Sequence, residues 1–283
     1  MTSSTPTTIF GNPGLIDIRA VTVLGVNIKD SKSPIGFFGT GFKYALATLL
    51  RHNMTLSIYR GLERTDFFSD DEMIRGQLVR MIHMRSENEV LGRSERLGFT
   101  TELGKNWEPW MCFRELYSNM LDEGGAIEHT LNPREGHTLI VVHGQKMKEL
   151  VADRRRYFLE SKPLWSGEKI EIHPGESTHY FYRGVRSSPL PRPSTFTFNI
   201  TSELRLNEDR MLSDPYDAEH RIRNALASEV DDSDLLLKVC YVKSRIDRAQ
   251  TFVGGLTHPW TELSEAARTF LEKKMTSCGR LTR

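Results

Sequence analysis

Glu115, Asn119 and Asp122 carry side chains that could together bind a metal ion and activate water. They lie in the segment 114–123, whose sequence is RELYSNMLDE. In a helix of about 3.6 residues per turn they fall within one narrow arc, and apolar residues occupy the opposite arc. Carboxylate and amide oxygens are the ligands that a divalent cation with a polyphosphate prefers, and a carboxylate can also deprotonate water. The alternative is an ordinary solvated polar face of a helix.

A glycine-rich loop forms a second candidate site. Gly36, Gly39 and Gly41 have the spacing G-x-x-G-x-G and come directly before the segment 42–52. Glycines let the backbone turn tightly and approach a ligand, and the start of a helix offers free N–H groups that suit phosphate. The spacing matches neither a Walker loop nor a Rossmann fingerprint, so an ordinary glycine turn is the alternative. Lys43 could contact phosphate, or it could be a solvated lysine at the start of the helix.

Hydrophobic spacing predicts the elements that must position these residues. Leucines at helical spacing predict a helix over 42–52, and an amphipathic pattern predicts a helix over 107–123 that Gly124 and Gly125 end. We expect a turn at 11–14 and a connecting loop at 85–98. The other predicted elements are strands over 55–59, 77–84, 138–142, 169–173, 178–185 and 195–201, and helices over 146–159, 214–228 and 262–274.

Composition excludes several classes of protein. The 283 residues include 38 Lys and Arg against 37 Asp and Glu, a net charge of +1, so a strongly basic nucleic-acid binder or a polybasic membrane protein is not expected. The sequence contains no run of about 18 apolar residues, so a membrane span is not predicted. Residues 1–8 are polar and lack a signal pattern. Three widely spaced cysteines predict no disulfide framework, so we expect a cytoplasmic protein, in the host cytoplasm if it is viral.

The composition changes near Lys162, where short alternating stretches and the proline-rich turn 189–193 begin. We therefore expect two domains, over residues 1–160 and 161–283.

The segment 115–123 resembles the N-box of the GHKL ATPases, the superfamily of gyrase B, MutL, the ninety-kilodalton heat-shock chaperones, MORC proteins and sensor histidine kinases. The family pattern places an Asn four residues after a Glu and an Asp three residues later, often followed by Glu. Glu115, Asn119, Asp122 and Glu123 have this spacing. The spacing of these residues is fairly specific to the family, and the helix and the glycine loop together are more specific than either motif alone.

The glycine loop resembles the second glycine box of the same family. The stretches 23–29 and 34–43 look most like MORC and heat-shock members, so the resemblance covers residues 11–52 and 107–123. In ordinary members the N-box comes first, so the resemblance implies a circularly permuted chain. The family's D-x-G-x-G box is degenerate here, because Phe10 stands where the adenine-binding Asp belongs. Asp17 lies nearby but is shifted, with the character of a helix cap.

The stretch 204–212, LRLNEDRML, is similar to a motif of the transducer or middle domain of the heat-shock chaperones. In that motif an arginine binds the γ-phosphate of ATP, and Asn207 and Arg210 keep its three-residue spacing. The resemblance implies the same role for Arg210. The alternative is a surface arginine paired with Glu208 or Asp209.

The resemblance implies an α/β protein of the α+β type, a two-layer sandwich with a Bergerat-type mixed sheet and helices on one face, plus a smaller transducer-like second part. ATP and Mg²⁺ are the implied ligands, with Asn119 holding magnesium, Glu115 activating water and Arg210 completing the site. The other implied binding residues are Asp122, Gly36, Gly39, Thr40, Gly41, Phe42 and Lys43.

The expected function is that of an ATPase in which ATP binding closes the two parts of the protein and hydrolysis drives the cycle of closure and opening. Two alternatives stay open, a nucleotide-binding interaction protein without hydrolysis and a histidine-kinase-type protein kinase. The expected partners are ATP and either a second copy or a protein client, with no membrane, and nucleic acid is not indicated.

Overall fold

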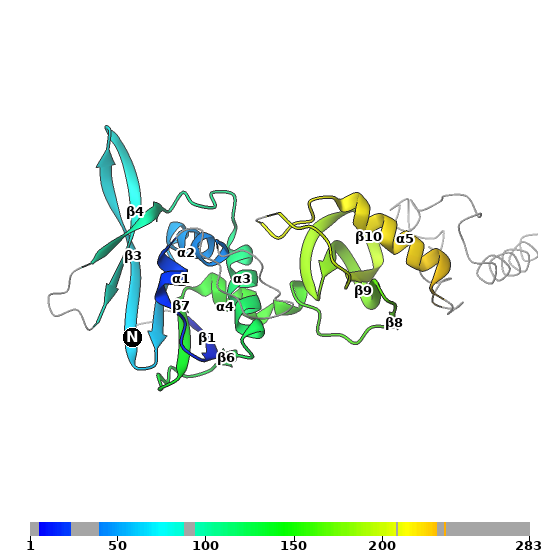
Figure 1. Cartoon of the computed structure of the whole chain (residues 1–283), viewed down its shortest axis with the longest axis horizontal. Helices are drawn as coiled ribbons and strands as arrows, with labels where there is room; N and C mark the ends of the chain where they lie inside the picture. Colours follow the sequence, from blue (N-terminus) through cyan, green and yellow to red (C-terminus); the bar gives the residue numbers. More distant parts are fainter. Residues whose placement is uncertain (1–5, 24–39, 88–93, 208, 231–234, 236–283) are drawn as a thin grey trace, which may run out of the picture. The chain divides into compact units, whose positions relative to one another are not determined.

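The computed structural model describes residues 6–23, 40–87, 94–207, 209–230 and 235 (Figure 1). The chain divides into two compact units between Arg154 and Arg155. This division lies a few residues before the change in composition at Lys162.

The first unit is built on a seven-stranded sheet whose order is β5-β4-β3-β2-β7-β1-β6. The resemblance to the GHKL ATPases implies a mixed sheet, but each pairing between the described strands is antiparallel. The unit therefore has an α+β arrangement, with antiparallel strands and helices packed on them. Its elements are β1 (Thr7–Pro13), α1 (Ile18–Thr22), α2 (Gly41–Arg51), β2 (Thr55–Arg60), β3 (Glu63–Ile74), β4 (Gln77–Ser86), β5 (Glu95–Thr100), α3 (Pro109–Asp122), β6 (Ala126–Glu128), β7 (His137–His143) and α4 (Gln145–Ala152).

The centre of this sheet carries the core that supports the helices. Phe10 of β1 and Ile58 of β2 both pair with Ile140 of β7, so the three side chains share one face. All three are at most 2% exposed. α2 contacts β2, whereas α3 and α4 contact β1, and α2 and α3 pack against each other (Figure 1). This packing brings the start of α2 to the side of α3.

The second unit contains a strongly curled hairpin. β8 (Trp165–Ser166), β9 (Ile170–Tyr182) and β10 (Val185–Ile200) form an antiparallel sheet of order β10-β9-β8, preceded by a 3₁₀ turn at Arg154–Arg156. Phe181 of β9 pairs with both Arg186 and Asn199 of β10, so the two ends of β10 meet at the end of β9. Figure 1 shows the resulting curl of the two strands.

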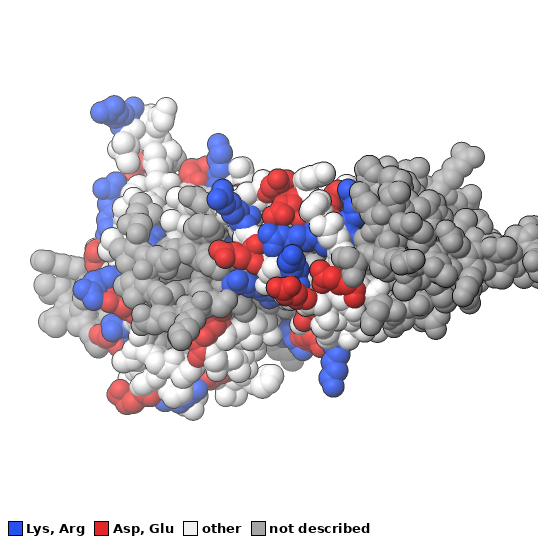
Figure 2. Space-filling view, turned by 45° about the vertical axis from the view of Figure 1, so that its right-hand side comes forward, with Lys and Arg blue, Asp and Glu red and all other residues white. Residues whose placement is uncertain are grey.

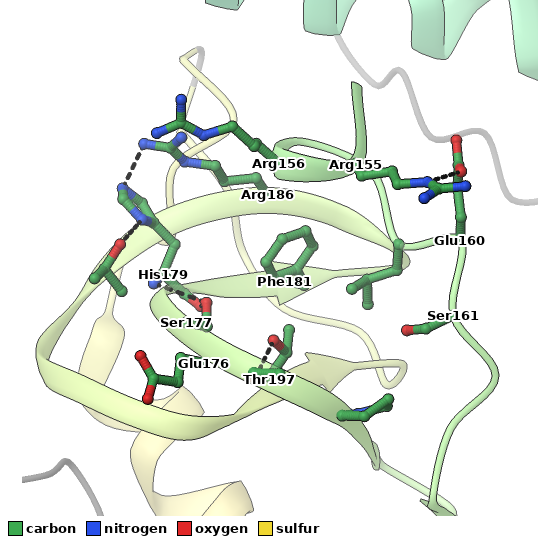
Figure 3. Close-up of a pocket in the computed structure, with 14 residues that line it drawn as sticks. Arg155, Arg156, Glu160, Ser161, Glu176, Ser177, His179, Phe181, Arg186 and Thr197 are labelled. Atoms are coloured by element: carbon green, nitrogen blue, oxygen red, sulfur yellow. Dashed lines mark hydrogen bonds and ion pairs between the residues drawn. The ribbon is translucent and has the colours of Figure 1, made fainter. Parts of the chain in front are cut away.

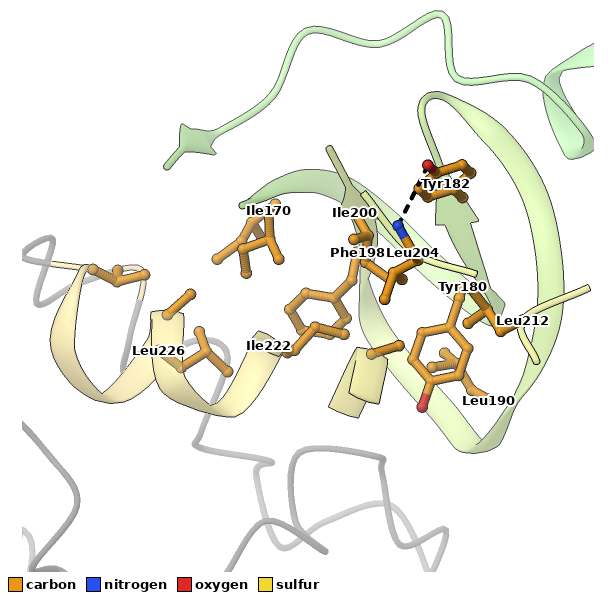
Figure 4. Close-up of a cluster of buried hydrophobic side chains, with 14 of the residues drawn as sticks. Ile170, Tyr180, Tyr182, Leu190, Phe198, Ile200, Leu204, Leu212, Ile222 and Leu226 are labelled. Carbon is orange, nitrogen blue, oxygen red and sulfur yellow. Dashed lines mark hydrogen bonds between the residues drawn. The ribbon is translucent and has the colours of Figure 1, made fainter. Parts of the chain in front are cut away.

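Helix α5 (Pro215–Ser228) closes the core of the second unit. Its Ile222 packs with Tyr180 of β9 and Phe198 of β10, and all three are fully buried (Figure 4). Asp214 caps the helix by accepting a hydrogen bond from the backbone N–H of Tyr216.

Most of the predicted elements are confirmed, and the errors have local causes. α2, α3, α5, β2, β4 and β7 correspond to predicted segments. The predicted turn at 11–14 is wrong because β1 continues to Pro13, and only Gly14 has a positive φ of 85°. The loop predicted at 85–98 is wrong at Arg85 and Ser86, which end β4, and over Glu95–Gly98, which belong to β5.

Two further differences concern segment length. The strands predicted at 169–173 and 178–185 are largely one strand, β9, which passes through Pro174 and Gly175 without ending. The helix predicted over 146–159 ends at Ala152. The helix predicted over 262–274 lies outside the described residues.

Candidate functional site

The start of α2 is the first part of the candidate site. Thr40 occupies its N-cap position, and within the described residues its side chain makes no capping hydrogen bond. The first N–H groups of a helix have no partner inside the helix and carry the positive end of its dipole. The start of α2 therefore suits an anionic group.

Helix α3 supplies the second part. Pro109 begins the helix at the position where a missing N–H costs nothing. Phe113 and Leu116 are fully buried and hold the helix in place. Glu115 is only 3% exposed, so the solvated polar face that the sequence left open is wrong for this carboxylate.

The carboxylate of Glu115 lies against the backbone of Gly41. A Cβ atom added at Gly41 would lie 2.5 Å from Glu115 Cδ and 2.6 and 2.7 Å from its two oxygens. Only glycine leaves room for the carboxylate here. The structure thus brings together two residues from the two motifs, which are far apart in the sequence.

Asn119 holds the Glu115 side chain in this position. Its Nδ2 donates a hydrogen bond of 2.9 Å to Glu115 Oε1 across one turn of α3. The carbonyl oxygen of the same amide is the end that binds hard cations. Asp122 is the last residue of α3 and is half-buried.

Lys43 lies in the first turn of α2 and is fully buried. This overturns the alternative of a solvated lysine. Burial lowers the pKa of its ammonium group, because the charged form loses its hydration. A lysine at this depth is a stronger local source of positive charge than a surface lysine, since water screens it less. Phe42 beside it is 8% exposed and contributes to the core.

The remaining candidate residues lie elsewhere. Gly36 and Gly39 are outside the described residues. Arg210 belongs to the second unit and is 6% exposed, with a left-handed backbone at φ 56°. Its N–H donates to the carbonyl of Asn207, and its carbonyl accepts from Ser187 Oγ at 2.9 Å. The three-residue spacing of Asn207 and Arg210 therefore forms a tight turn, with the arginine buried rather than at the surface.

Asp17 has the role of a helix cap, as its sequence position indicated. It is the N-cap of α1 and accepts from the N–H of Arg19 at 2.9 Å. The hydrogen bonds from Arg19 lower the pKa of the carboxyl to about 2. The carboxylate of Asp17 is thus hydrogen-bonded to a residue of the helix that it caps.

Asn12 is a buried polar residue for which the sequence predicts no role beyond a turn. It is 9% exposed, and its Oδ1 has no hydrogen-bond partner among the described residues. A Cβ at Gly125, just after α3, would lie 2.5 Å from this oxygen. The available signal was its alternation with Thr8 and Phe10 on one face of β1. The turn signal around it concealed that pattern.

Other kinds of site find little support in the described part of the chain. No cluster of three or more His, Cys, Asp or Glu residues that could hold a metal occurs there. None of its helices has the length and apolar character that crossing a membrane requires. On the face in Figure 2, acidic and basic side chains are interspersed, without a broad patch of one sign. A basic surface of the kind that binds nucleic acid is not visible on this face.

Comparison with known proteins identifies no relative, since no family model, no curated protein and no solved structure matches the chain.

Cys112 lies on α3 close to the site but is chemically inert in this fold. It is fully buried, and burial raises the pKa of its thiol to about 12. Because only the thiolate reacts, we expect iodoacetamide at pH 8 to leave Cys112 unmodified in the folded protein and to modify it in urea. Peptide mapping by mass spectrometry measures both. Rapid modification of the folded protein would contradict the burial of this helix face.

Proposed function

We propose that the first unit binds ATP with magnesium and hydrolyses it. The start of α2 receives the phosphates, and Glu115 of α3 activates the attacking water. The observation that carries the proposal is the contact between Gly41 and the Glu115 carboxylate. The resemblance of both segments to the GHKL motifs supports the same assignment.

The charges at this place explain why magnesium would be needed. A phosphate at the start of α2 would lie close to the buried carboxylate of Glu115. Two negative charges in a poorly solvated place repel strongly. The amide oxygen of Asn119 and the carboxylate of Asp122 are suitable ligands for a cation that relieves the repulsion. Magnesium, when bound, would neutralise charge on the phosphates.

In this proposal different residues of the chain have different roles. The N–H groups near Thr40 and Gly41 hold phosphate oxygens, and Lys43 adds positive charge in the same turn. Glu115 takes the proton of a water molecule, and the Asn119 N–H keeps its carboxylate oriented. Gly36 and Gly39 lie outside the described residues, and only the resemblance gives them a part in binding the phosphates. A role for Arg210 at the γ-phosphate requires its turn to open, because the side chain is buried.

A second candidate function is nucleotide binding without hydrolysis, as in a regulatory interaction protein. Its support is Phe10, which is fully buried in β1 at the place of the family's adenine-binding Asp. Both functions require binding of Mg-ATP, and only the first requires turnover. Phosphate release from ATP by the purified protein therefore separates them.

Asn119→Ala tests the binding that both functions share. It removes the amide oxygen proposed to hold magnesium, so we expect the affinity for ATP in the presence of Mg²⁺ to fall by roughly tenfold or more, a usual cost of disrupting a metal site. The affinity without Mg²⁺ should change little. Isothermal titration calorimetry with and without the metal measures both.

A matched control is Asn224→Ala, which removes an exposed asparagine from α5. It should bind Mg-ATP as the wild type does. Unchanged Mg-ATP affinity in a folded Asn119→Ala protein would remove the metal role of this residue. Absence of ATP binding by the wild type would end the proposed function.

A further inference from the structure

A cavity of about 600 Å³ lies within the second unit. Its walls come from the segment 155–161, from β9 around Ser177 and from Arg186 and Thr197 of β10 (Figure 3). Sites for small molecules have volumes of roughly 300–1,000 Å³, so the cavity is large enough for a small ligand. Among the described residues that line it, none belongs to the group proposed to bind ATP.

Ser161 presents a hydroxyl group to this cavity. The residue is exposed, and in Figure 3 its oxygen points toward the interior of the cavity. The chain around it is anchored on both sides. Before it, the N–H of Leu159 donates to the carbonyl of Gly184 at 2.8 Å, and after it, the N–H of Leu164 donates to the carbonyl of Ile172 at 2.7 Å. The fold thus holds this hydroxyl at a defined place on the cavity wall.

The imidazole ring of His173 lies beside the Ser161 hydroxyl. Its Nδ1 is 3.1 Å from Ser161 Oγ, and its Nε2 is 3.1 Å from Glu171 Oε2. Glu171 and His173 are two residues apart on β9 and share one face of the strand, whereas Ile170 and Ile172 belong to the hydrophobic core on the other face. The ring itself is buried. A serine, a histidine and a carboxylate are therefore linked in a chain that ends at the cavity.

The neighbours of Glu171 determine where the ring proton lies. Asn199 pairs with Glu171 across the sheet, and its Oδ1 accepts from the N–H of Gly184 at 2.8 Å. Its Nδ2 therefore faces Glu171 and donates to Oε2 at 2.7 Å. A carboxylate oxygen only accepts, so His173 Nε2 carries the proton that it donates to Glu171. In the neutral ring Nδ1 then has a lone pair, to which the Ser161 hydroxyl donates.

This arrangement can activate a serine hydroxyl as a nucleophile. A neutral imidazole nitrogen takes the proton as the oxygen attacks, and a carboxylate on the other nitrogen orients the ring and stabilises the imidazolium that forms. Either ring nitrogen can be the base, since the bond made by the other nitrogen decides which one carries the proton. Ser161, His173 and Glu171 have the contacts that this chemistry requires.

A second hydroxyl–histidine pair in the same unit lacks this property. His179 Nδ1 is 2.9 Å from Thr178 Oγ1, but its Nε2 is 2.7 Å from Arg186 Nη2. A guanidinium group only donates, so Nε2 is the acceptor and Nδ1 carries the ring proton. The Thr178 hydroxyl therefore faces a donor rather than a base. Of the two pairs, only Ser161 with His173 is arranged for proton transfer from the hydroxyl.

We propose that Ser161 is the nucleophile of an esterase site in the second unit, with His173 as its base and Glu171 as a positioning residue. Ser161 Oγ bonds to the acyl carbon of a carboxylic ester while its proton passes to His173 Nδ1. That proton then passes to the alcohol oxygen as the carbon–oxygen bond of the ester breaks. Water attacks the acyl-serine and gives a proton to Nδ1, which returns to Ser161 Oγ as the carboxylic acid leaves.

The cavity indicates the class of ester. Its volume limits the substrate to a small molecule. Leu159, Pro174 and Phe181 supply apolar surface that suits the uncharged acyl or alcohol part of an ester. An alcohol is also a better leaving group than an amine, so a site of this kind takes an ester more readily than an amide.

The test uses the full-length protein without ATP or magnesium. A fluorophosphonate reagent phosphonylates an activated serine hydroxyl with loss of fluoride, so we expect mass spectrometry to find the label on the peptide that contains Ser161. We also expect hydrolysis of p-nitrophenyl acetate, and the label should abolish it. Ser161→Ala should lose both the label and this hydrolysis. The matched control is Ser213→Ala, which removes an exposed serine outside the cavity lining and should behave as the wild type does.

Two variants test the activation of the hydroxyl. His173→Gln should lower the rates of labelling and of ester hydrolysis by roughly 10²–10⁴-fold, the usual contribution of a general base. Glu171→Gln should lower kcat by roughly 100-fold or more with little change in KM, because it removes the acceptor that sets the ring tautomer. Glu171 is partly exposed, so this variant keeps the test valid if His173→Gln fails to fold.

Three results would overturn the proposal. They are a label that persists in Ser161→Ala, labelling and hydrolysis that are unchanged in folded His173→Gln or Glu171→Gln proteins, and a wild type that neither reacts with the reagent nor hydrolyses the ester. The last result would show that the chain of hydrogen bonds is only structural. Mg-ATP affinity should be unchanged in Ser161→Ala, so this proposal and the one for the first unit succeed or fail separately.

Discussion

Glu115→Gln is expected to retain ATP binding and to lower the rate of hydrolysis by roughly 10²–10⁴-fold, the usual contribution of a general base. Glutamine has the same shape, and its Oε1 can still accept the hydrogen bond that Asn119 donates at 2.9 Å. The buried packing against Gly41 is therefore preserved. What is lost is the ability to take a proton from water. Phosphate release under saturating Mg-ATP measures the effect, with calorimetry for binding.

Glu123→Gln provides the control for this experiment. It makes the same chemical change at the end of the same helix, where the side chain is exposed. Its hydrolysis rate should equal that of the wild type. Wild-type turnover in Glu115→Gln would reject the base role. If the wild type binds Mg-ATP but shows no turnover, the function without hydrolysis replaces the one proposed.

The helices of the candidate site could be predicted from the sequence because their apolar residues have a strong helical period. Leu46, Leu49 and Leu50 are all buried on α2, and Phe113 and Leu116 on α3. A helical period of apolar residues can be recognised in the local sequence without knowledge of distant contacts. This is why α2 and α3 begin and end within a few residues of their predicted limits.

Strands were harder to predict because their pairing partners are distant in the sequence. β3 carries the polar run Ser69–Glu72, which has no strand signal of its own, and it is held by β4 along its length. β9 runs through Pro174 and Gly175 because β10 curls around it. In both cases tertiary pairing outweighs local preference.

The geometry of the site, too, could be predicted from the sequence only in part. The spacing of Glu115 and Asn119 predicts that they share one face of a helix, and their hydrogen bond confirms it. The burial of Glu115 and Lys43 depends on how α2 packs on α3, which no local pattern contains. The cavity beside Ser161 was also unpredicted, since its walls come from segments that only the curl of β9 and β10 brings together.

Gly41→Ala is expected to lower the hydrolysis rate by about 100-fold while leaving the protein folded. The new Cβ would lie 2.5 Å from Glu115 Cδ, so the carboxylate must move. A displacement of about 1 Å at a catalytic group can cost roughly 10²-fold in rate. The fold should survive, because the atoms that must shift are the flexible end of a side chain and alanine is a better helix former than glycine. Circular dichroism and phosphate release measure the two effects.

Gly98→Ala is the matched control, since a Cβ there would meet nothing within 4 Å. It should leave the hydrolysis rate unchanged. The sharper test is the double variant Gly41→Ala with Glu115→Gln. If Gly41 acts by leaving room for the catalytic carboxylate, the alanine has little left to disturb once the base is gone, and the double variant should be about as slow as Glu115→Gln alone. Multiplication of the two losses would show that Gly41 serves the reaction by another route, and an unaffected Gly41→Ala protein would mean that the contact with Glu115 has no part in catalysis.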